Sequence, residues 1–197
     1  GVGKESDIFL GLAPGDKKVI VKFLRIGRTS FRRTRITRSW GEDPKYTWFH
    51  QSKIAAEREY RALHELYYAR ASVPGPLAYN RHAIVIKYVD GVELYTKPPL
   101  NNPYYTLEVI LDTLRKAYVD VGIVHGDLSE YNVLVDLETS RPYIIDWPQY
   151  IEKEYPSSMD LLCRDIEYIA RFFRKNYRVE VSLDRALKYV IGETESF

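Results

Sequence analysis

The sequence predicts an α+β fold with two lobes, in which the first half carries strands and one helix and the second half is mainly helical. Short apolar runs bounded by Pro and Gly dominate the first half, as expected for strands of an antiparallel sheet. The segments 106–121 and 159–177 instead repeat apolar residues at helical spacing. Prolines between residues 98 and 103 separate the two patterns. This order predicts a cleft between two lobes, where a ligand can bind.

The first lobe, residues 1–90, is expected to hold four strands and one helix. A helix is predicted to begin at Ser52, whose hydroxyl suits an N-cap, and to run to about Tyr68. The pair Asp90-Gly91 is typical of a turn. The strands are expected at residues 7–10, 19–24, 77–79 and 83–88.

The second lobe, residues 91–197, is expected to be built around helices. The strongest amphipathic pattern runs from Thr106 to Val121 and is closed by Gly122. Two short apolar runs after it predict strands. These strands are expected at 133–135 and 143–145, and two further helices at 159–177 and 183–191.

Composition excludes several classes of protein. The chain has 197 residues, 45% of them hydrophobic and 28% charged, which is typical of a folded soluble protein and not of a disordered tail or a fibre. No apolar run is long enough for a membrane span. Cys163 is the only cysteine, which excludes an internal disulfide and a Cys-rich zinc site. We therefore expect a cytoplasmic protein, whose natural start lies upstream because Gly1 is not preceded by Met.

Basic residues are concentrated near the start of the chain. Residues 1–61 contain 14 Lys and Arg against 7 Asp and Glu, and six arginines fall within 25–38, which has no acid. Such a segment suits contact with the phosphates of RNA, and it equally suits a solvated loop. We expect a flexible basic loop over about residues 25–50, with 25–38 as a candidate RNA contact.

Three polar residues in the second lobe form a candidate phosphoryl-transfer site. Asp127 is followed five residues later by Asn132, on a loop that leads into an apolar strand. Asp146 ends the next predicted strand, fourteen residues after Asn132. A carboxylate can orient or deprotonate a nucleophile, and an amide oxygen with a second carboxylate can bind Mg²⁺. This spacing predicts that Asn132 and Asp146 share one metal ion beside Asp127.

The first lobe offers residues for the phosphates of a nucleotide. Gly1, Gly3, Lys4 and Ser6 precede a predicted strand, which indicates a phosphate-covering flap and not a P-loop, because P-loops lead into helices. Lys22 lies on an apolar strand, where its charge needs an acidic partner. Glu57 and Glu59 on the following helix are both candidates for that partner.

The order of these residues resembles that of protein kinases, with clear departures. His125-Gly126-Asp127 stands in place of His-Arg-Asp, and Asp146-Trp147-Pro148 in place of Asp-Phe-Gly. No Ala-Pro-Glu motif follows, and only 51 residues remain after Asp146. The chain is therefore too short for an activation loop with a full peptide-binding subdomain.

With these departures, the motifs closely resemble those of the atypical RIO kinase family, in its Rio-two branch. The resemblance spans residue 1 to about 177 and implies a trimmed protein-kinase-like fold, without the winged-helix domain that precedes the kinase domain in this branch. The segments that carry it are Gly3–Ile8, Gly27–Arg32, Tyr79–Ala83, His125–Asp127 and Ile145–Gln149.

Family resemblance implies an atypical serine/threonine protein kinase or ATPase that uses ATP with Mg²⁺, or with Mn²⁺ as an alternative. It selects Glu59 as the partner of Lys22, makes Asp127 catalytic and places a transient phosphoryl group on Asp146. It implies partners in the maturing small ribosomal subunit and its rRNA. The implied ATP-binding residues are Gly1, Gly3, Lys4, Ser6, Lys22, Glu59, Lys87 and Val89, and the implied metal ligands are Asn132 and Asp146.

Two other functions stay open at this point. One is an ATP-sensing assembly factor that binds RNA and has little kinase activity. The other is a small-molecule phosphotransferase of the aminoglycoside or choline type, although such enzymes need a longer helical insert. Among the remaining polar residues, we expect Asp165 and His125 to hold the loop of Asp127 by hydrogen bonds, and Cys163 to lie in or near the core.

Overall fold

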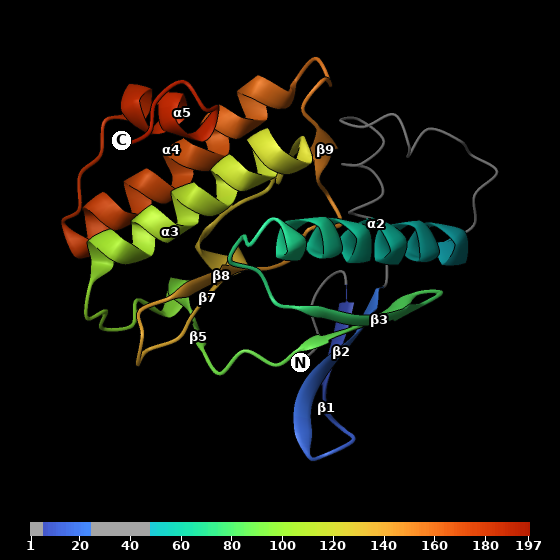
Figure 1. The fold of residues 1–197 in the computed structure, drawn as a ribbon. Coiled ribbons are helices and arrows are strands. Elements are labelled where there is room, and N and C mark those ends of the chain that lie inside the picture. Colours follow the sequence, from blue (N-terminus) through green and yellow to red (C-terminus); the bar gives the residue numbers. More distant parts are fainter. Residues whose placement is uncertain (1–5, 25–47) are drawn as a thin grey trace. The chain divides into compact units, whose positions relative to one another are not determined.

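The computed structural model describes residues 6–24 and 48–197, which form two compact units (Figure 1). Unit 1 contains the described residues up to Arg61 together with Gly75–Tyr88. Unit 2 contains Ala62–Pro74 and Val89–Phe197. The division falls within helix α2 (Trp48–Tyr68), and each unit is described separately below.

Unit 1 is built on an antiparallel sheet of four strands. The strand order is β1-β2-β4-β3, and β1 and β2 form a hairpin. Gly15 and Asp16 in its turn have φ of 79° and 55°, a conformation that Gly and Asp adopt more readily than other residues. The strands are β1 (Ser6–Ala13), β2 (Lys17–Leu24), β3 (Pro76–Asn80) and β4 (Ala83–Lys87).

The register of this sheet fixes the environment of Lys22. Lys22 on β2 pairs with Ile8 on β1 and with Ile84 on β4. Because paired residues point to the same face of a sheet, Lys22 shares its face with these apolar neighbours. Lys22 is 6% exposed and Ile84 is fully buried.

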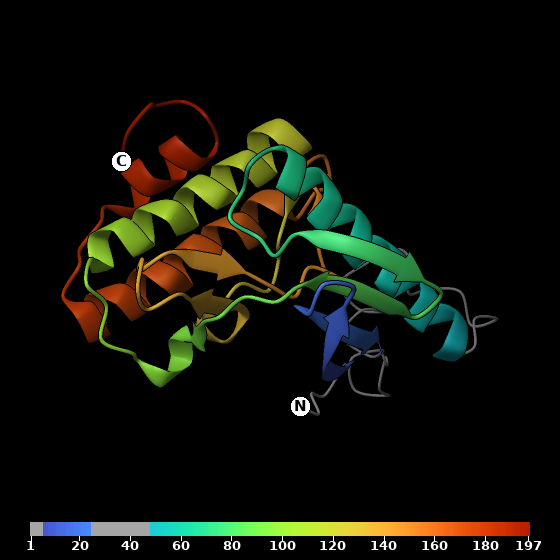
Figure 2. The same cartoon turned by 60° about the horizontal axis from the view of Figure 1, so that its bottom comes forward.

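Unit 2 contains three packed helices and a π-helical turn. Helix α3 (Pro103–Lys116) continues into η3 (Ala117–Val121) and ends at Gly122, whose φ is 79°. Helices α3, α4 (Ser158–Tyr177) and α5 (Leu183–Val190) are in mutual contact, and α3 and α4 lie alongside each other in Figures 1 and 2. Asn102 caps α3 by accepting the N–H of Tyr105 at 3.0 Å.

Short strands in unit 2 form two small antiparallel sheets. Strands β5 (Val92–Glu93), β7 (Val133–Val135) and β8 (Pro142–Ile144) form an antiparallel sheet in that order. Strands β6 (Ile123–Val124) and β9 (Ile151–Glu152) form a separate pair. The 3₁₀ turn η2 (Leu94–Thr96) follows β5, and the 3₁₀ turn η4 (Glu130–Asn132) precedes β7.

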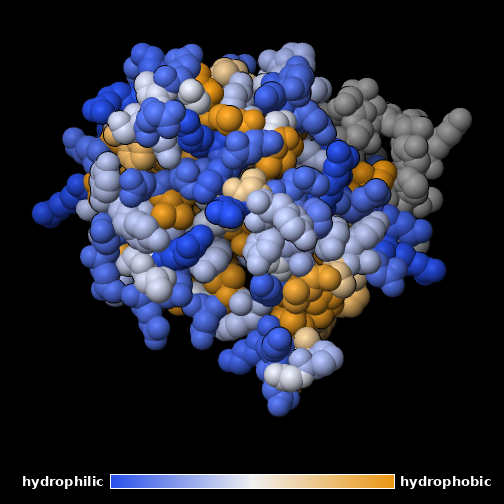
Figure 3. All heavy atoms as spheres, viewed as in Figure 1, coloured by the Kyte–Doolittle hydropathy of each residue, from blue (hydrophilic) through white to orange (hydrophobic). Residues whose placement is uncertain are grey.

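The core of unit 2 fills the space between these helices and strands. Trp147 and Phe173 are its largest fully buried side chains. On the face drawn in Figure 3, hydrophobic residues form separate patches among hydrophilic ones. The aliphatic residues of this core include Leu107, Ile110, Leu111, Leu114, Val133, Ile144, Leu162, Ile166 and Ile169.

Two local predictions were wrong. Helix α2 begins at Trp48, so Ser52 is not its N-cap but a buried residue within the helix. Asp90-Gly91 does not form a turn but leads directly into β5. A Cβ on Gly91 would lie 2.9 Å from the carbonyl oxygen of Val135, so Gly is required there for close approach to β7 and not for turning.

Within the described ranges, no helix combines the length and the apolar character that crossing a membrane requires.

Candidate active site

The loop between β6 and β7 brings the three predicted phosphoryl-transfer residues together. Asn132 donates its side-chain N–H to the carbonyl oxygen of Asp127 at 2.9 Å. The backbone carbonyl of Asn132 accepts the N–H of Ile145, also at 2.9 Å. Ile145 directly precedes Asp146. Asn132 is therefore bonded to Asp127 and to the residue before Asp146, and we call Asp127, Asn132 and Asp146 the cluster.

Asp146 adopts an uncommon backbone conformation at the end of β8. Its φ is 67°, in the left-handed region that Asp and Asn tolerate better than most residues. Next to it, Trp147 is fully buried and donates its indole N–H to the carbonyl of Ile144 at 3.2 Å. Trp147 thus anchors the chain immediately after Asp146, while the Asp146 side chain remains partly exposed.

His125 links the loop of Asp127 to the segment of Asp146, as predicted for it. Its Nδ1 accepts the backbone N–H of Asp127 at 3.3 Å, and its Nε2 lies 3.1 Å from the carbonyl oxygen of Ile145. A backbone N–H can only donate, so the proton of the neutral ring resides on Nε2 and is donated to Ile145. The ring packs against Trp147, with centroids 4.6 Å apart.

Asp165 on α4 binds the backbone of the same loop, which confirms the expectation that it holds this loop by hydrogen bonds. Its carboxylate accepts the N–H of Gly126 at 2.7 Å and that of Leu128 at 3.1 Å. Arg164, which sequence reasoning did not single out, donates to the carbonyl of Gly126. The two neighbours on α4 therefore bind one polar group of each peptide unit that flanks Asp127, namely the carbonyl of Gly126 and the N–H of Leu128.

Burial governs the ionisation of Asp165. The side chain is 1% exposed, and burial raises its pKa from 3.8 to about 7. The two N–H groups and the Arg164 guanidinium lower this pKa, while the charge of Asp127 raises it. Because the pKa is raised overall, burial has a larger effect on it than the two hydrogen bonds have.

The donor set of the cluster suits Mg²⁺ better than a metal held by many protein ligands. No group of three or more His, Cys, Asp or Glu side chains in residues 6–24 and 48–197 is placed to hold a metal ion. Mg²⁺ typically takes one or two carboxylates and completes its shell with water and substrate phosphates. Because the Asn132 amide nitrogen donates to Asp127, its oxygen is the atom that can ligate a cation, together with Asp146.

Unit 1 contains a buried ion pair. The Nζ of Lys22 lies 2.7 Å and 2.8 Å from the two carboxylate oxygens of Glu59. Glu59 is 1% exposed, whereas Glu57 points to solvent and is not the partner. The geometry thus selects between the two glutamates that sequence reasoning left open. Ser6, at the start of β1, is also buried.

The remaining predicted ATP-binding residues fall in different regions. Lys87 ends β4, and its backbone N–H donates to the carbonyl of Gly75 at 2.8 Å. Val89 follows in a segment without regular secondary structure. Gly1, Gly3, Lys4 and the basic segment 25–38 lie outside the described residues, as does the expected loop up to residue 47.

The prediction that Cys163 lies in or near the core was wrong. Cys163 is exposed on α4 and does not lie in the core. It follows the buried Leu162 and precedes Arg164, so it sits at the edge of the helix face that packs inward. Partial burial and the charge of Asp160 raise the pKa of its thiol, which makes it a poor nucleophile at neutral pH.

Comparison with known proteins identifies relatives over most of the chain. Residues 7–186 match the RIO domain family. The RIO-type serine/threonine-protein kinase Rio2 of Methanocaldococcus jannaschii is 35% identical, over 96% of this chain and 73% of the relative. The serine/threonine-protein kinase rio2 of Schizosaccharomyces pombe is 30% identical, over 90% of this chain and 52% of the relative. The chain therefore spans between half and three quarters of the length of these two relatives.

A solved structure shares the fold. The Rio2 kinase–ADP/Mg²⁺–phosphoaspartate complex from Chaetomium thermophilum superposes with a TM-score of 0.75 at 29% identity, covering all of this chain and 61% of that one. This likeness confirms the α+β, kinase-like fold expected from the sequence. Together with the Rio2 relatives, it also confirms the resemblance to the Rio-two branch.

Proposed function

The chain belongs to the RIO domain family, and on that basis we propose that it catalyses phosphoryl transfer from ATP in the presence of Mg²⁺. The observation that supports the proposal is the pair of hydrogen bonds by which Asn132 binds Asp127 and Ile145, the residue directly before Asp146. These three residues offer a carboxylate for the nucleophile, and an amide oxygen and a second carboxylate that suit a metal ion. A purely structural loop has no need of this combination.

Each residue of the cluster has a separate role in the proposal. Asp127 orients the attacking group and accepts its proton when that group is a hydroxyl or water. Asn132 and Asp146 hold Mg²⁺, which neutralises charge on the phosphates when it is bound. His125 and Asp165 hold the backbone on both sides of Asp127 in place.

The Lys22–Glu59 pair is proposed to serve the nucleotide from unit 1. An ammonium ion held on both carboxylate oxygens of a buried glutamate has a fixed position. From that position it can contact the phosphates of ATP, as the corresponding pair does in protein kinases. Ser6 and the residues before it are proposed to cover the phosphates, and the backbone of Lys87 and Val89 to meet the adenine.

We propose that Asp146 itself is the first acceptor of the phosphoryl group. In this step an oxygen of the Asp146 carboxylate bonds to the γ-phosphorus, the bond to the bridging oxygen breaks, and ADP leaves. Water then cleaves the aspartyl phosphate and releases inorganic phosphate. A structure of the fungal relative contains a phosphoaspartate. The partial exposure of Asp146 is compatible with both steps.

A serine or threonine of a protein is the second candidate acceptor. The names of the archaeal and yeast relatives, which are serine/threonine-protein kinases, favour it. In that case the hydroxyl proton passes to Asp127 as the oxygen attacks the γ-phosphorus. Family membership further supports a role in small ribosomal subunit maturation, with pre-ribosomal particles and rRNA as partners, and a cytoplasmic location.

Steady-state release of phosphate from ATP tests the proposal. We expect Mg²⁺-dependent turnover that falls by about 10² to 10⁴ in Asp127→Asn and in Asp146→Asn, because each removes a group used in the reaction. Asp120→Asn is the matched control, since it makes the same change at an exposed position of η3. Mn²⁺ in place of Mg²⁺ tests the choice of metal.

Two results would refute this function. Turnover that is equal in Asp127→Asn, Asp146→Asn and the Asp120→Asn control would remove the cluster from the reaction. Tight ATP binding without any turnover in the unaltered chain would instead favour an ATP-sensing binding module. Circular dichroism of each variant checks that the fold is unchanged.

A further inference from the structure

Two segments of unit 2 form a surface ribbon, of which the proposed reaction uses only Asn132. Residues 90–96 contain β5 and η2, and residues 130–138 contain η4 and β7. Val92 pairs with Val135, and Glu93 with Leu134, so the two segments run antiparallel. We call residues 90–96 and 130–138 the β5–β7 ribbon.

One end of the ribbon carries an exposed aromatic pair. The rings of Tyr95 and Tyr131 are stacked, with centroids 4.9 Å apart and planes at 22°. Tyr95 is 41% exposed and Tyr131 is 60% exposed, so a large part of both rings faces solvent. Rigid, exposed tyrosines are common in binding surfaces, where a ring face accepts a planar or cationic group.

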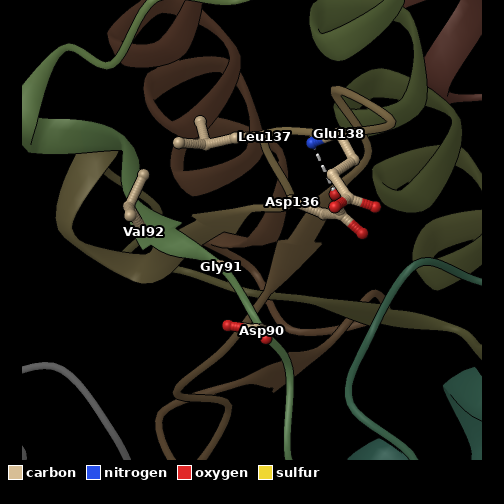
Figure 4. Close-up of a pocket in the computed structure, with 6 residues that line it drawn as sticks. All are labelled: Asp90, Gly91, Val92, Asp136, Leu137 and Glu138. Carbon is tan, nitrogen blue, oxygen red and sulfur yellow. Dashed lines mark hydrogen bonds between the residues drawn. The ribbon is translucent and has the colours of Figure 1, made fainter.

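The other end of the ribbon borders a pocket of about 320 Å³. Figure 4 shows that one strand and the loop after β7 supply its walls. Two apolar residues, Val92 and Leu137, are exposed beside three carboxylates. The lining residues are Asp90, Gly91, Val92, Asp136, Leu137 and Glu138.

Two carboxylates of this pocket, those of Asp136 and Glu138, lack cationic partners within unit 2. Asp136 accepts the N–H groups of Glu138 and Thr139 at 2.9 Å and 3.1 Å, which fixes its side chain. Across the described part of the chain, neither Asp136 nor Glu138 takes part in an ion pair. Their negative charge is therefore available to a cation from outside the chain.

A third feature on the ribbon points to the same kind of ligand. The Oε2 atom of Glu130 is buried and has no hydrogen-bond partner. A buried carboxylate oxygen without a donor is costly, and an incoming N–H group would satisfy it. Glu130 directly precedes Tyr131 in η4, so this oxygen belongs to the same turn as the aromatic pair.

Charge decides which ligand fits the ribbon. Its residues include five acids, namely Asp90, Glu93, Glu130, Asp136 and Glu138, and no Lys or Arg. A polyanion such as RNA would be repelled, whereas a guanidinium group can stack on a tyrosine and bind a carboxylate through two N–H groups. An ammonium group offers neither the planar face nor the paired donors.

We propose that the β5–β7 ribbon is a docking surface for an arginine-rich segment of a partner protein. One arginine enters the pocket of Asp136 and Glu138, and another stacks on the Tyr95–Tyr131 pair. Val92 at the pocket and Tyr95 at the stack are three residues apart, so at most roughly 10 Å of chain separates them, and Tyr95 lies in the shorter 3₁₀ turn η2. Arginines three residues apart in an extended partner segment match this spacing. The surface binds without nucleotide, so this proposal does not rest on the proposed function.

Fluorescence anisotropy with a labelled peptide tests the proposal on the full chain without ATP. The probe carries an arginine at every third position among serines and glycines, and the same peptide with glutamates is the negative probe. We expect Glu138→Lys to weaken binding about tenfold or more, because it removes one attraction and adds a repulsion. Glu154→Lys makes the same change beside β9, far from β5 in Figure 1, and should leave most of the affinity.

Aromatic variants test the second half of the surface. Tyr131→Ala should weaken binding several-fold, whereas Tyr131→Phe should retain it, because the ring face is kept. Equal affinity in Glu138→Lys and Glu154→Lys, or equal affinity in Tyr131→Ala and Tyr131→Phe, would overturn the proposal. So would tighter binding of a labelled oligouridylate that is lost in Tyr131→Ala, since that identifies an RNA surface.

Discussion

Lys22 places its ammonium nitrogen 2.7 Å and 2.8 Å from the two carboxylate oxygens of Glu59, a residue 37 positions later in the sequence. Both side chains are almost fully buried. Two opposite charges at this distance in a buried site stabilise each other, but either one alone would be strongly destabilising. The pair is therefore fixed in place and sensitive to the loss of one partner.

Removal of Glu59 alone should destabilise the protein. We expect Glu59→Ala to lower the free energy of unfolding by about 3 to 5 kcal/mol, because it leaves a buried ammonium ion without its anion. Urea denaturation followed by circular dichroism measures this change. A loss below about 1 kcal/mol would show that the Lys22 charge finds other compensation.

A double variant separates stability from function. Lys22→Met combined with Glu59→Leu replaces the ion pair by apolar side chains of similar size, and should recover most of the stability lost in Glu59→Ala. ATP turnover should stay low, because the ammonium group proposed to contact the phosphates is absent. Recovery of both stability and turnover would contradict the proposed role of Lys22.

The buried Asp165 predicts a specific pH dependence of stability. Its pKa is raised to about 7 in the folded chain, from 3.8 for the ordinary group. Between these values the folded chain retains a proton that the unfolded chain has lost. The free energy of unfolding should therefore fall as the pH rises from about 4 to about 7 and then become level.

Asp165→Asn isolates this contribution, because the variant has no group that titrates at the position. Subtracting its unfolding free energy from that of the unaltered chain should leave a difference that declines across the same pH range. A difference that is constant, or that grows with pH, would mean that the hydrogen bonds from Gly126 and Leu128 outweigh burial.

A side chain at position 91 should destabilise the protein. Its added Cβ would lie 2.9 Å from the Val135 carbonyl oxygen and 3.0 Å from the carbonyl carbon, so β5 and β7 would have to separate. We expect Gly91→Ala to cost about 1 to 3 kcal/mol of unfolding free energy. At Gly11 the nearest atom to an added Cβ is a side-chain methyl at 3.3 Å. Gly11→Ala should therefore cost less, and an equal cost in thermal or urea unfolding would contradict this account.

The sequence predicted most of the regular elements because their patterns are local. Strands β2 and β7 and helix α4 were expected within a few residues of their observed bounds. The strands that were missed, β5, β6 and β9, have two residues each. Strands this short have no periodicity of their own and exist because a distant segment pairs with them.

Local signals also misled where tertiary packing decided the outcome. Ser52 is a good N-cap residue, yet helix formation extends back to Trp48 and buries Ser52 within the helix. Asp90-Gly91 has turn composition, but Gly91 is needed for close approach to Val135. In both cases the residue has a structural role, but it differs from the role that the local pattern indicated.

The candidate site was predictable in its residues but not in all its supports. The spacing of Asp127, Asn132 and Asp146 indicated a cluster, and the structure shows the hydrogen bonds that assemble it. Arg164 gave no sequence signal, because an exposed arginine on a helix is commonplace until its contact with the Gly126 carbonyl is seen. The aromatic pair of Tyr95 and Tyr131 likewise joins residues 36 positions apart in the sequence.

The most direct test of the central claim is a single-turnover reaction with γ-labelled ATP and Mg²⁺, stopped by denaturation. We predict label on the protein that hydroxylamine releases and that is absent in Asp146→Asn, because the phosphoryl group forms an acyl phosphate on Asp146. Label of equal amount in Asp146→Asn, resistant to hydroxylamine and stable in acid, would contradict Asp146 as first acceptor and place the phosphoryl group on a serine or threonine.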